Sequence, residues 1–410
     1  MEWYDKFLDE LTLYRPETPD STALITRAVE RGWQGNLWHC SLTESLLAVP
    51  NVFSLACERR RPARDSLWEI ALRDMGVYRS LFNIRIDDPV LTDFRHDSDM
   101  ARTPGARRLT ALARSLAGAA DPGEMLDLLT AHYERFGLGA LGMGEIFRVA
   151  GQGEELRFTP VEHRRPVHLS DLVGYETQKE LLLENTLSFL AGRRANNVLL
   201  YGDAGTGKST SIQAIAGDFA DRGLRLIELY KHQFALIPDI LDRIKGRNYR
   251  FLLFLDDLSF EENEVEYKHL KAVMEGGAEA APENVLIYAT SNRRHLIRET
   301  WNDRADMQHD GDIHRSDTVE EKLSLAGRFG LQIYYPNPSF EEYHHIVRAL
   351  AERSGTLSAY TDAQLRSLAA AWQVRRGSRS GRTAQQFIYD LMSRTRDAEP
   401  EQEDSPHADP

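Results

Sequence analysis

The chain has few cysteines and no long apolar run. Only Cys40 and Cys57 occur in 410 residues, too few for a disulfide framework or a structural zinc site. No stretch of about 18 apolar residues is present, which argues against a membrane-spanning helix. The first five residues lack the basic and then apolar layout of a signal peptide. We therefore expect a reduced, cytoplasmic protein that does not associate with membranes.

Positive charge is also scarce. The chain has 50 Lys and Arg against 63 Asp and Glu, and its formal net charge is −13. This balance argues against a broadly basic surface that binds nucleic acid through its phosphates. A local basic groove is not excluded, so nucleic acid stays open as a partner that the charge does not support. Basic clusters at residues 59–61 and 375–376 are equally typical of solvated faces.

One complete motif stands out, because residues 202–209 read G-D-A-G-T-G-K-S and match the phosphate-loop pattern. An apolar, strand-like run leads into it and helical spacing follows, so backbone N–H groups and a helix N-terminus can cradle phosphates. Lys208 can reach the β- and γ-phosphates, and the Ser209 hydroxyl can ligate Mg²⁺. The predicted ATP-binding residues here are Gly202, Asp203, Ala204, Gly205, Thr206, Gly207, Lys208, Ser209 and Thr210.

Periodicity divides the chain into four parts. Residues 1–165 show helical spacing broken by prolines and predict a mainly helical N-terminal domain. Residues 166–337 alternate strand-like and helical segments, which predicts an α/β domain with a parallel sheet. Residues 338–396 hold three helical patterns and predict a small lid, whereas the acidic residues 397–410 predict a disordered tail. Strands are expected at residues 198–201, 224–230, 249–255, 285–289 and 331–335.

Two features of the N-terminal part allow alternative interpretations. Four of the six tryptophans fall in the first 70 residues, which predicts an aromatic-rich helical core or, alternatively, an exposed docking face. Residues 137–142 spell G-x-G-x-x-G, but no βαβ unit surrounds them, so a tight connection explains the glycines better than a dinucleotide site.

Two acids follow the apolar residues 251–255. Asp256 lies 48 residues after Lys208 (256 − 208), and we assign it to the Mg²⁺ shell. We assign Asp257 to orienting the attacking water, although Glu261 or Glu262 could supply the base instead.

The strand-like run at residues 285–289 ends in Thr-Ser-Asn. At that strand end Asn292 can orient water or sense the γ-phosphate, and an ordinary Ser-Asn turn is the alternative.

In this order the motifs resemble those of AAA+ ATPases. Residues 325–331 contain R-F-G-L, similar to the segment before the fifth strand in replication initiators and helicase loaders. The resemblance implies that Arg328 reaches the ATP site of a neighbouring subunit as an arginine finger, and hence that the chain forms a homo-oligomer. A surface ion pair is the alternative role for this arginine.

Two further segments carry the same resemblance. Residues 380–384 look like the sensor-2 position of AAA+ lids, which implies that Arg382, or else Arg379, contacts the phosphates. Residues 171–175 resemble the segment that packs against adenine, which implies base contacts from Val173 and Gly174, with a plain loop as the alternative.

Within the superfamily, residues 167–394 look most similar to an uncharacterised bacterial group of predicted ATPases, known only as a domain of unknown function. The strings that carry this likeness are G-Y-E-T-Q-K, N-N-V-L-L-Y-G-D, D-D-L-S-F-E and E-E-K-L-S-L. The resemblance implies ATP binding and Mg²⁺-dependent hydrolysis that moves the lid and the N-terminal domain against an unknown protein partner. It supplies no substrate.

Several other functions stay open. A nucleic-acid-associated initiator or loader fits the R-F-G-L segment, but no appended DNA-binding helix is visible. A non-hydrolysing scaffold fits the short side chain of Asp257, and a simple P-loop kinase would leave the lid without a role. Phe234 lacks the glycine of a substrate-threading pore loop. The histidines at 309 and 314 lie in a polar stretch without strong metal-ligand spacing, which favours a solvated insertion.

Overall fold

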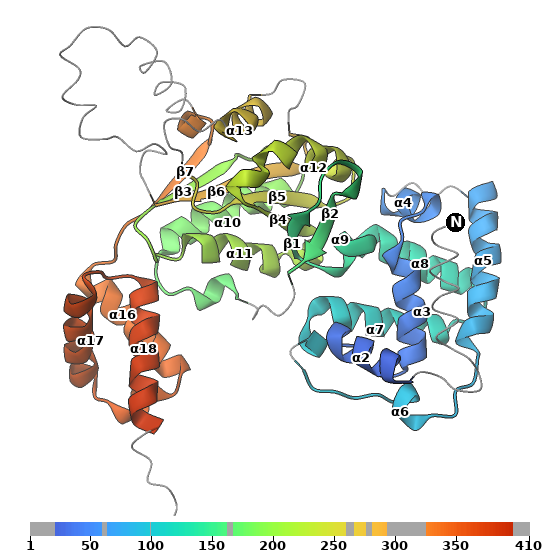
Figure 1. Ribbon diagram of the computed structural model, residues 1–410, viewed down its shortest axis with the longest axis horizontal. Helices are drawn as coiled ribbons and strands as arrows, with labels where there is room; N and C mark the ends of the chain where they lie inside the picture. Colours follow the sequence, from blue (N-terminus) through green and yellow to red (C-terminus); the bar gives the residue numbers. More distant parts are fainter. Residues whose placement is uncertain are drawn as a thin grey trace, which may run out of the picture.

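A computed structural model gives the architecture and describes residues 21–59, 64–98, 100–161, 167–259, 266–275, 281–292 and 325–396. A group of N-terminal helices lies at one side, a sheet between helices lies in the middle, and a C-terminal group of helices lies at the other side (Figure 1). The predicted fold class is confirmed: an α/β core with a parallel P-loop sheet, a small helical lid and a mainly helical N-terminal part.

The N-terminal helices pack around two apolar clusters. Trp38 is 4% exposed and belongs to the first cluster, together with Met75 and Leu129 from two other helices. Trp33 is fully buried in the second cluster. Both tryptophans therefore belong to a core and not to an exposed docking face. The elements are α2 (Ser21–Arg31), α3 (Leu37–Ala48), α4 (Val52–Glu58), α5 (Ser66–Phe82), α6 (Pro89–Thr92), η1 (Met100–Arg102), α7 (Pro104–Ala117), α8 (Pro122–Phe136) and α9 (Gly139–Met143).

The central sheet has seven strands in the order β2-β1-β4-β5-β6-β3-β7. β1 and β2 are antiparallel, and the other neighbouring pairs are parallel. The central strands β3, β5 and β6 are nearly continuous apolar runs, as expected for parallel strands that helices cover on both faces. The strands are β1 (Ile146–Ala150), β2 (Arg157–Pro160), β3 (Val198–Gly202), β4 (Leu224–Leu229), β5 (Arg250–Leu255), β6 (Val285–Ser291) and β7 (Leu331–Tyr335).

Strands β1 and β2 lie within residues 1–165, which the sequence assigns to the helical N-terminal domain. β1 pairs in parallel with β4, and Phe147 lies opposite Ile227. Phe147 is fully buried in the core of the sheet, so this segment completes the α/β unit. We therefore correct the proposed domain boundary from residue 165 to about residue 144. Of residues 137–142, which the sequence predicts to be a tight connection, only residues 137 and 138 join α8 to α9, and the other four lie in α9 immediately before this strand.

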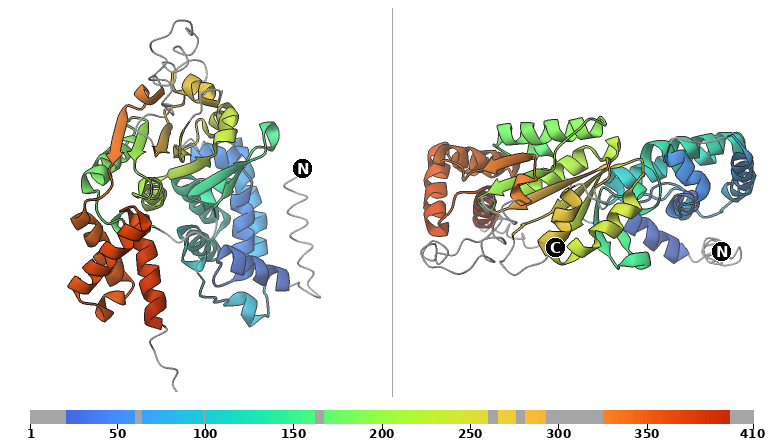
Figure 2. Two further views of the ribbon diagram at one scale, coloured as in Figure 1. Left: turned by 60° about the vertical axis from the view of Figure 1, so that its left-hand side comes forward. Right: turned by 90° about the horizontal axis from the view of Figure 1, so that it is seen from above.

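Helices cover both faces of the sheet (Figure 2). On one face α12 (Ile237–Ile244) and α13 (Glu266–Met274) share a core with alternate strand residues such as Leu253. On the other face α10 (Glu176–Leu190) and α11 (Lys208–Asp218) pack on residues such as Leu252. Short 3₁₀ turns complete this unit: η2 (Gly153–Glu155), η3 (Leu169–Asp171), η4 (Ala220–Arg222) and η5 (Lys231–Leu236).

The lid follows β7 after a short proline-containing link. Ser339 begins its first helix with a capping box, in which the Ser339 hydroxyl and the Glu342 carboxylate each accept a hydrogen bond from the other residue's backbone N–H. A separate apolar cluster that includes Tyr343 and Ile388 holds the helices together. The elements are α16 (Phe340–Arg353), η7 (Thr356–Ala359), α17 (Asp362–Arg376) and α18 (Gly381–Arg396).

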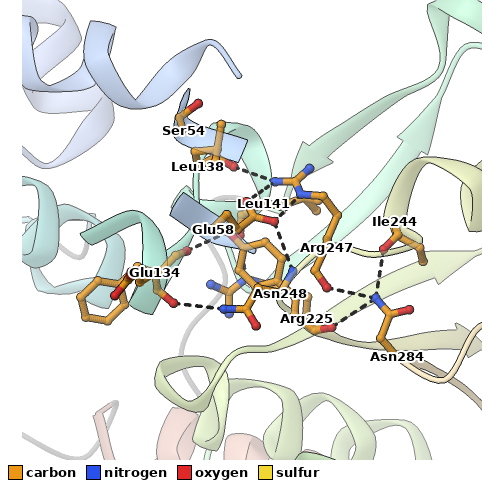
Figure 3. Close-up of polar contacts among 12 residues, drawn as sticks. Ser54, Glu58, Glu134, Leu138, Leu141, Arg225, Ile244, Arg247, Asn248 and Asn284 are labelled. Carbon is orange, nitrogen blue, oxygen red and sulfur yellow. Dashed lines mark hydrogen bonds and ion pairs between the residues drawn. The ribbon is translucent and has the colours of Figure 1, made fainter. Parts of the chain in front are cut away.

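Polar contacts fasten the N-terminal helices to the sheet at the start of β5 (Figure 3). The Arg225 guanidinium, 1% exposed, donates to the Leu141 carbonyl at 2.6 Å. The Tyr249 hydroxyl donates to the Phe136 carbonyl at 2.7 Å, directly before β5 begins. Because these groups are buried and satisfied by backbone of the N-terminal part, the two regions share a specific interface.

No single helix in the described ranges is long and apolar enough to cross a membrane. Helices α3 and α4 together pass by length and composition, but they are bent by 83° and contribute buried residues to the N-terminal core. Cys40 and Cys57 are free and buried there, and burial raises the pKa of the Cys40 thiol to about 12.

Candidate ATP site

A cavity of about 730 Å³ opens at the carboxyl ends of β3, β5 and β6, beside the lid. This volume lies within the range of about 300–1,000 Å³ that is usual for small-molecule sites, and the location follows the rule for parallel α/β sheets. Among the predicted residues, the cavity is lined by Val173, Gly174, Ala204, Gly205, Thr206, Gly207, Lys208, Ser209, Thr210, Asp256, Asp257, Asn292 and Arg382.

The loop between β3 and α11 has a backbone that only glycine supports at its first position. Gly202 has φ +134°, and a Cβ there would lie 2.1 Å from the Tyr335 carbonyl oxygen. Gly207 has φ +94° and immediately precedes α11, whose first residue is Lys208. The first residues of α11, Lys208 to Ser211, line the cavity together with the loop, and a helix N-terminus at such a loop fits a phosphate group.

Lys208 is held by the loop itself. Its ammonium donates to the carbonyls of Gly202 at 2.9 Å and Asp203 at 2.6 Å, and to the Asn292 side-chain oxygen at 3.1 Å. The residue is only 5% exposed. Burial lowers the pKa of this amine, whereas the carboxylates of Asp203 and Asp257 act in the opposite direction. A phosphate would supply the charge that these neutral acceptors cannot.

Asp256, which the sequence assigns to the Mg²⁺ shell, lies beside Ser209. Its Oδ1 accepts hydrogen bonds from the Ser209 hydroxyl at 2.6 Å and from the Thr290 hydroxyl at 2.6 Å. A carboxylate and a hydroxyl within one hydrogen bond are hard oxygen donors of the kind that Mg²⁺ prefers. The residues present therefore fit the predicted cation.

Asn292 links Lys208 to Asp257. The Asn292 amide donates to Asp257 Oδ1 at 2.8 Å, and its carbonyl oxygen accepts from Lys208. One side chain thus joins the phosphate-binding lysine to the acid that we assign to water activation. Asp257 has φ +53°, a left-handed conformation that is uncommon for a residue with a Cβ.

The lid contacts the phosphate loop through the first turn of α18. The Arg382 backbone N–H donates to the Gly205 carbonyl at 3.3 Å. A Cβ on Gly205 would lie 2.9 Å from the Ser380 hydroxyl and 3.1 Å from the Arg382 Cβ. Arg382 lines the cavity, whereas its alternative, Arg379, is not among the lining residues. The geometry therefore favours Arg382 as the lid residue that approaches the phosphates.

Four of the residues that line the cavity have large aliphatic side chains, and we refer to them together as the apolar slot. Val173 and Leu172 line it from the segment before α10, and Ile346 and Leu350 line it from α16 of the lid. Gly174 has φ +82°, which turns the chain sharply beside the slot. Four aliphatic side chains offer a surface of the kind that a planar base packs against. The sequence predicts the first segment but not the two lid residues.

Three predicted residues do not line the cavity. Gly202 and Asp203 line a smaller neighbouring cavity of about 250 Å³ and reach the site through their carbonyls. Arg328 forms an ion pair with Glu275, with 2.5 Å between Nη2 and Oε1. A position outside the chain's own ATP site is what a finger for a neighbouring subunit requires, and the ion pair is also what the alternative predicts.

Some predictions fall on residues that the structure does not describe. They are the alternative bases Glu261 and Glu262, the histidines at 309 and 314, the first 20 residues of the predicted N-terminal domain and the acidic tail. Within the described part of the chain, no group of three or more His, Cys, Asp or Glu could hold a metal ion.

Comparison with known proteins identifies the family. A family model described as "Protein of unknown function (DUF815)" matches residues 145–395, more than half of the chain. The chain belongs to this family. The match begins at the start of the α/β unit and ends with the last lid helix.

Curated relatives of this DUF815 protein match parts of it. The replication factor C large subunit of Methanococcus maripaludis is 35% identical over 104 residues, which are 24% of this chain and 21% of that protein. The ATP-dependent zinc metalloprotease FtsH of Aquifex aeolicus is 24% identical over 238 residues, which are 51% of this chain and 34% of that protein. The chain thus spans about a third or less of these relatives' length.

Solved structures resemble the DUF815 protein at low identity. A variant of RuvB from Thermotoga maritima has a TM-score of 0.38 at 18% identity, and the match covers 57% of this chain and 67% of that one. The FIGL-1 AAA domain in complex with ADP has a TM-score of 0.39 at 18% identity, and the match covers 58% of this chain and 76% of that one.

Proposed function

We propose that this DUF815 protein hydrolyses ATP with Mg²⁺ and uses the nucleotide state to move its lid against a protein partner. The observation that carries this proposal is the Asn292 side chain, which bonds both Lys208 and Asp257. Lys208, which we assign to the phosphates, and Asp257, which we assign to the attacking water, are thereby held close together in one cavity.

Each side chain has a role in this proposal. Lys208 and Arg382 bind the phosphates, and the charge that develops on them in the transition state strengthens both contacts. Asp257 orients the attacking water and accepts its proton, while Asn292 keeps the carboxylate in place. Ser209 and Asp256 would hold Mg²⁺, which would supply positive charge to neutralise the phosphates.

The lid makes the site sensitive to the nucleotide. Ile346, Leu350 and Arg382 belong to the lid, whereas the phosphate loop belongs to the sheet. A nucleotide in the cavity touches both bodies at once, so its binding favours one lid position over others. We infer that release of the γ-phosphate relaxes this preference and moves the lid.

Arg328 supports a homo-oligomer in this proposal. Its side chain is 34% exposed and lies outside the chain's own cavity, so in a homo-oligomer a second copy would supply its Arg328 to the site. A cytoplasmic location, the oligomer and the unknown protein partner all remain predictions from the sequence.

ATP turnover per subunit should be measured against protein concentration, with native mass recorded alongside, for wild type and for Arg328→Ala. We expect turnover to rise with concentration, and Arg328→Ala to lower it by about 10³-fold while ATP still binds. If turnover per subunit does not change with protein concentration and is the same in Arg328→Ala, a monomeric switch describes the protein better.

Glu275→Gln is the matched control, because it breaks the same ion pair and leaves the arginine in place. A structural ion pair predicts equal losses for Glu275→Gln and Arg328→Ala. An arginine finger predicts that Glu275→Gln keeps most of the turnover. Absent turnover in wild type, with intact ATP binding, would favour the non-hydrolysing scaffold.

A further inference from the structure

The Thr290 hydroxyl contacts both acids of the candidate site. It lies on β6, between β3 and β5 in the sheet, and the residue is only 2% exposed. Its Oγ1 donates to Asp256 Oδ1 at 2.6 Å and accepts the backbone N–H of Asp257 at 3.0 Å. A single buried hydroxyl therefore spans two consecutive residues to which we assign different tasks.

These bonds explain how Asp257 keeps an unfavourable backbone. A left-handed conformation at a residue with a Cβ persists only where its surroundings hold it. Thr290 contributes two contacts to the turn, because its hydroxyl accepts from Asp257 and its carbonyl accepts the Leu258 N–H at 2.7 Å. The hydroxyl contact is the one that a side-chain substitution can remove.

The same hydroxyl also orients the carboxylate of Asp256. Ser209 and Thr290 both donate to Oδ1, and no donor to Oδ2 occurs in the part of the chain that the structure describes. Oδ2 is therefore the oxygen left for a metal-bound water. Without Thr290, only the Ser209 hydroxyl, which we also assign to the cation, would fix the rotation of this side chain.

We propose that Thr290 is a positioning residue that holds Asp256 and Asp257 in register for Mg²⁺ binding and water activation. The proposal rests on the proposed function, since it assigns these two acids to those tasks. The Asp257 N–H, the Thr290 hydroxyl and the Asp256 carboxylate form one donor-to-acceptor chain. Bonds in such a chain polarise and strengthen one another in a buried site.

Thr290→Val tests this, because valine has nearly the same shape but neither donates nor accepts. We expect kcat to fall by about 10- to 100-fold, the usual effect of losing a residue that orients a metal ligand. ATP affinity measured in EDTA should stay within about threefold. Addition of Mg²⁺ should tighten ATP binding less than in wild type. Thr290→Ser, which keeps the hydroxyl, should restore most of the turnover and of the Mg²⁺ effect.

Thr186→Val is the matched control for the loss of a buried hydroxyl. Thr186 is fully buried on α10 and bonds the Leu182 carbonyl and the Tyr288 hydroxyl, away from the acids. It should lower stability and leave kcat and the Mg²⁺ effect unchanged. A purely structural role for Thr290 predicts the same pattern for Thr290→Val, and that result would overturn the proposal.

Different results would contradict the proposed ATP hydrolysis and the proposed positioning role of Thr290. Wild type without turnover would remove the proposed hydrolysis, but the Mg²⁺-dependent gain in ATP affinity would still test Thr290. Wild-type turnover with an unchanged Thr290→Val variant would remove only the positioning role.

Discussion

Glu58 and Arg247, 189 positions apart in the sequence, form a two-pronged ion pair at the junction of the N-terminal helices and the sheet. Arg247 donates from Nε at 2.5 Å and from Nη2 at 2.7 Å, and the side chains are 1% and 13% exposed for Glu58 and Arg247. The Asn248 N–H adds a third bond to the same carboxylate at 3.2 Å. The junction therefore contains a buried ion pair in which both carboxylate oxygens of Glu58 accept hydrogen bonds (Figure 3).

Removal of one partner of this pair should be costly. Glu58→Ala leaves the Arg247 charge buried without its carboxylate, and we expect a loss of about 3–5 kcal/mol of unfolding free energy in urea denaturation. Asp97→Ala breaks the exposed Arg102 pair, where the arginine and aspartate side chains are 62% and 78% exposed, and should cost no more than about 1 kcal/mol.

The double variant Glu58→Leu with Arg247→Met should recover much of the loss, because it leaves no unpaired charge. A cost for the double variant equal to the sum of the costs of Glu58→Leu alone and Arg247→Met alone would show that the pair has no coupling energy.

Comparing Gly205→Ala with Gly355→Ala should distinguish the effect of a Cβ that contacts the lid from the cost of a positive φ in a residue with a Cβ. Gly205 has φ +78°, and the new Cβ would press on the first turn of α18. Gly355 has a similar φ of +74° with open space around it, so Gly355→Ala isolates the backbone cost, about 1–2 kcal/mol of stability. We expect Gly205→Ala to weaken ATP binding at least tenfold in calorimetric titration, and Gly355→Ala to leave affinity unchanged. Equal affinities for the two variants would contradict the lid contact.

ATP affinity should fall at alkaline pH. Burial lowers the pKa of Lys208 from its usual value, and the protonated amine is the form that attracts phosphate. Affinity should therefore be full well below this lowered pKa and decline as pH rises through it, at a lower pH than an exposed lysine would require. Lys208→Arg, which stays protonated, should bind more weakly at neutral pH but lose the alkaline decline. A decline that persists in Lys208→Arg would assign the titration to another group.

Asp257→Asn should reduce turnover by about 10²–10⁴-fold, the range expected on loss of a general base. ATP affinity should change little, because Asn292 rather than Asp257 bonds Lys208 directly. Glu261→Gln and Glu262→Gln provide the comparison, since either glutamate is an alternative base. Single-turnover hydrolysis by the three variants decides the assignment, and a normal rate in Asp257→Asn would transfer the role to a glutamate.

The phosphate loop and the acid Asp256 could be predicted because their chemistry is local in sequence. Glycine spacing, one lysine and an apolar run ending in acids occupy short windows, and the flanking strand and helix patterns set their orientation. The lid helices were predicted for the same reason, since apolar spacing and breakers mark them. The structure places these residues around one cavity.

Strand β1 could not be predicted because its environment comes from distant residues. The sequence I-F-R-V-A is five residues long, too short to distinguish a strand from a helix end by period alone. Its strand conformation depends on hydrogen bonds to β4, about 80 residues later.

The same limit applies to Ile346 and Leu350. In the sequence they are ordinary apolar positions of an amphipathic helix, and only the packing of the lid beside the sheet brings them to the slot. Thr290 is similar, because its two partners lie on another strand end.

The junction at the start of β5 also has a mechanical consequence. Six strand residues separate Tyr249, which bonds the N-terminal helices, from Asp256 at the other end of β5, a span of about 20 Å of extended backbone. The N-terminal helices thus contact one end of strand β5, and the acids Asp256 and Asp257 follow its other end. The N-terminal helices and the sheet share this interface, and residues 336–339 join the sheet to the lid. A partner bound to the N-terminal helices would therefore keep a fixed position relative to the sheet, and the lid would be the part that moves relative to both.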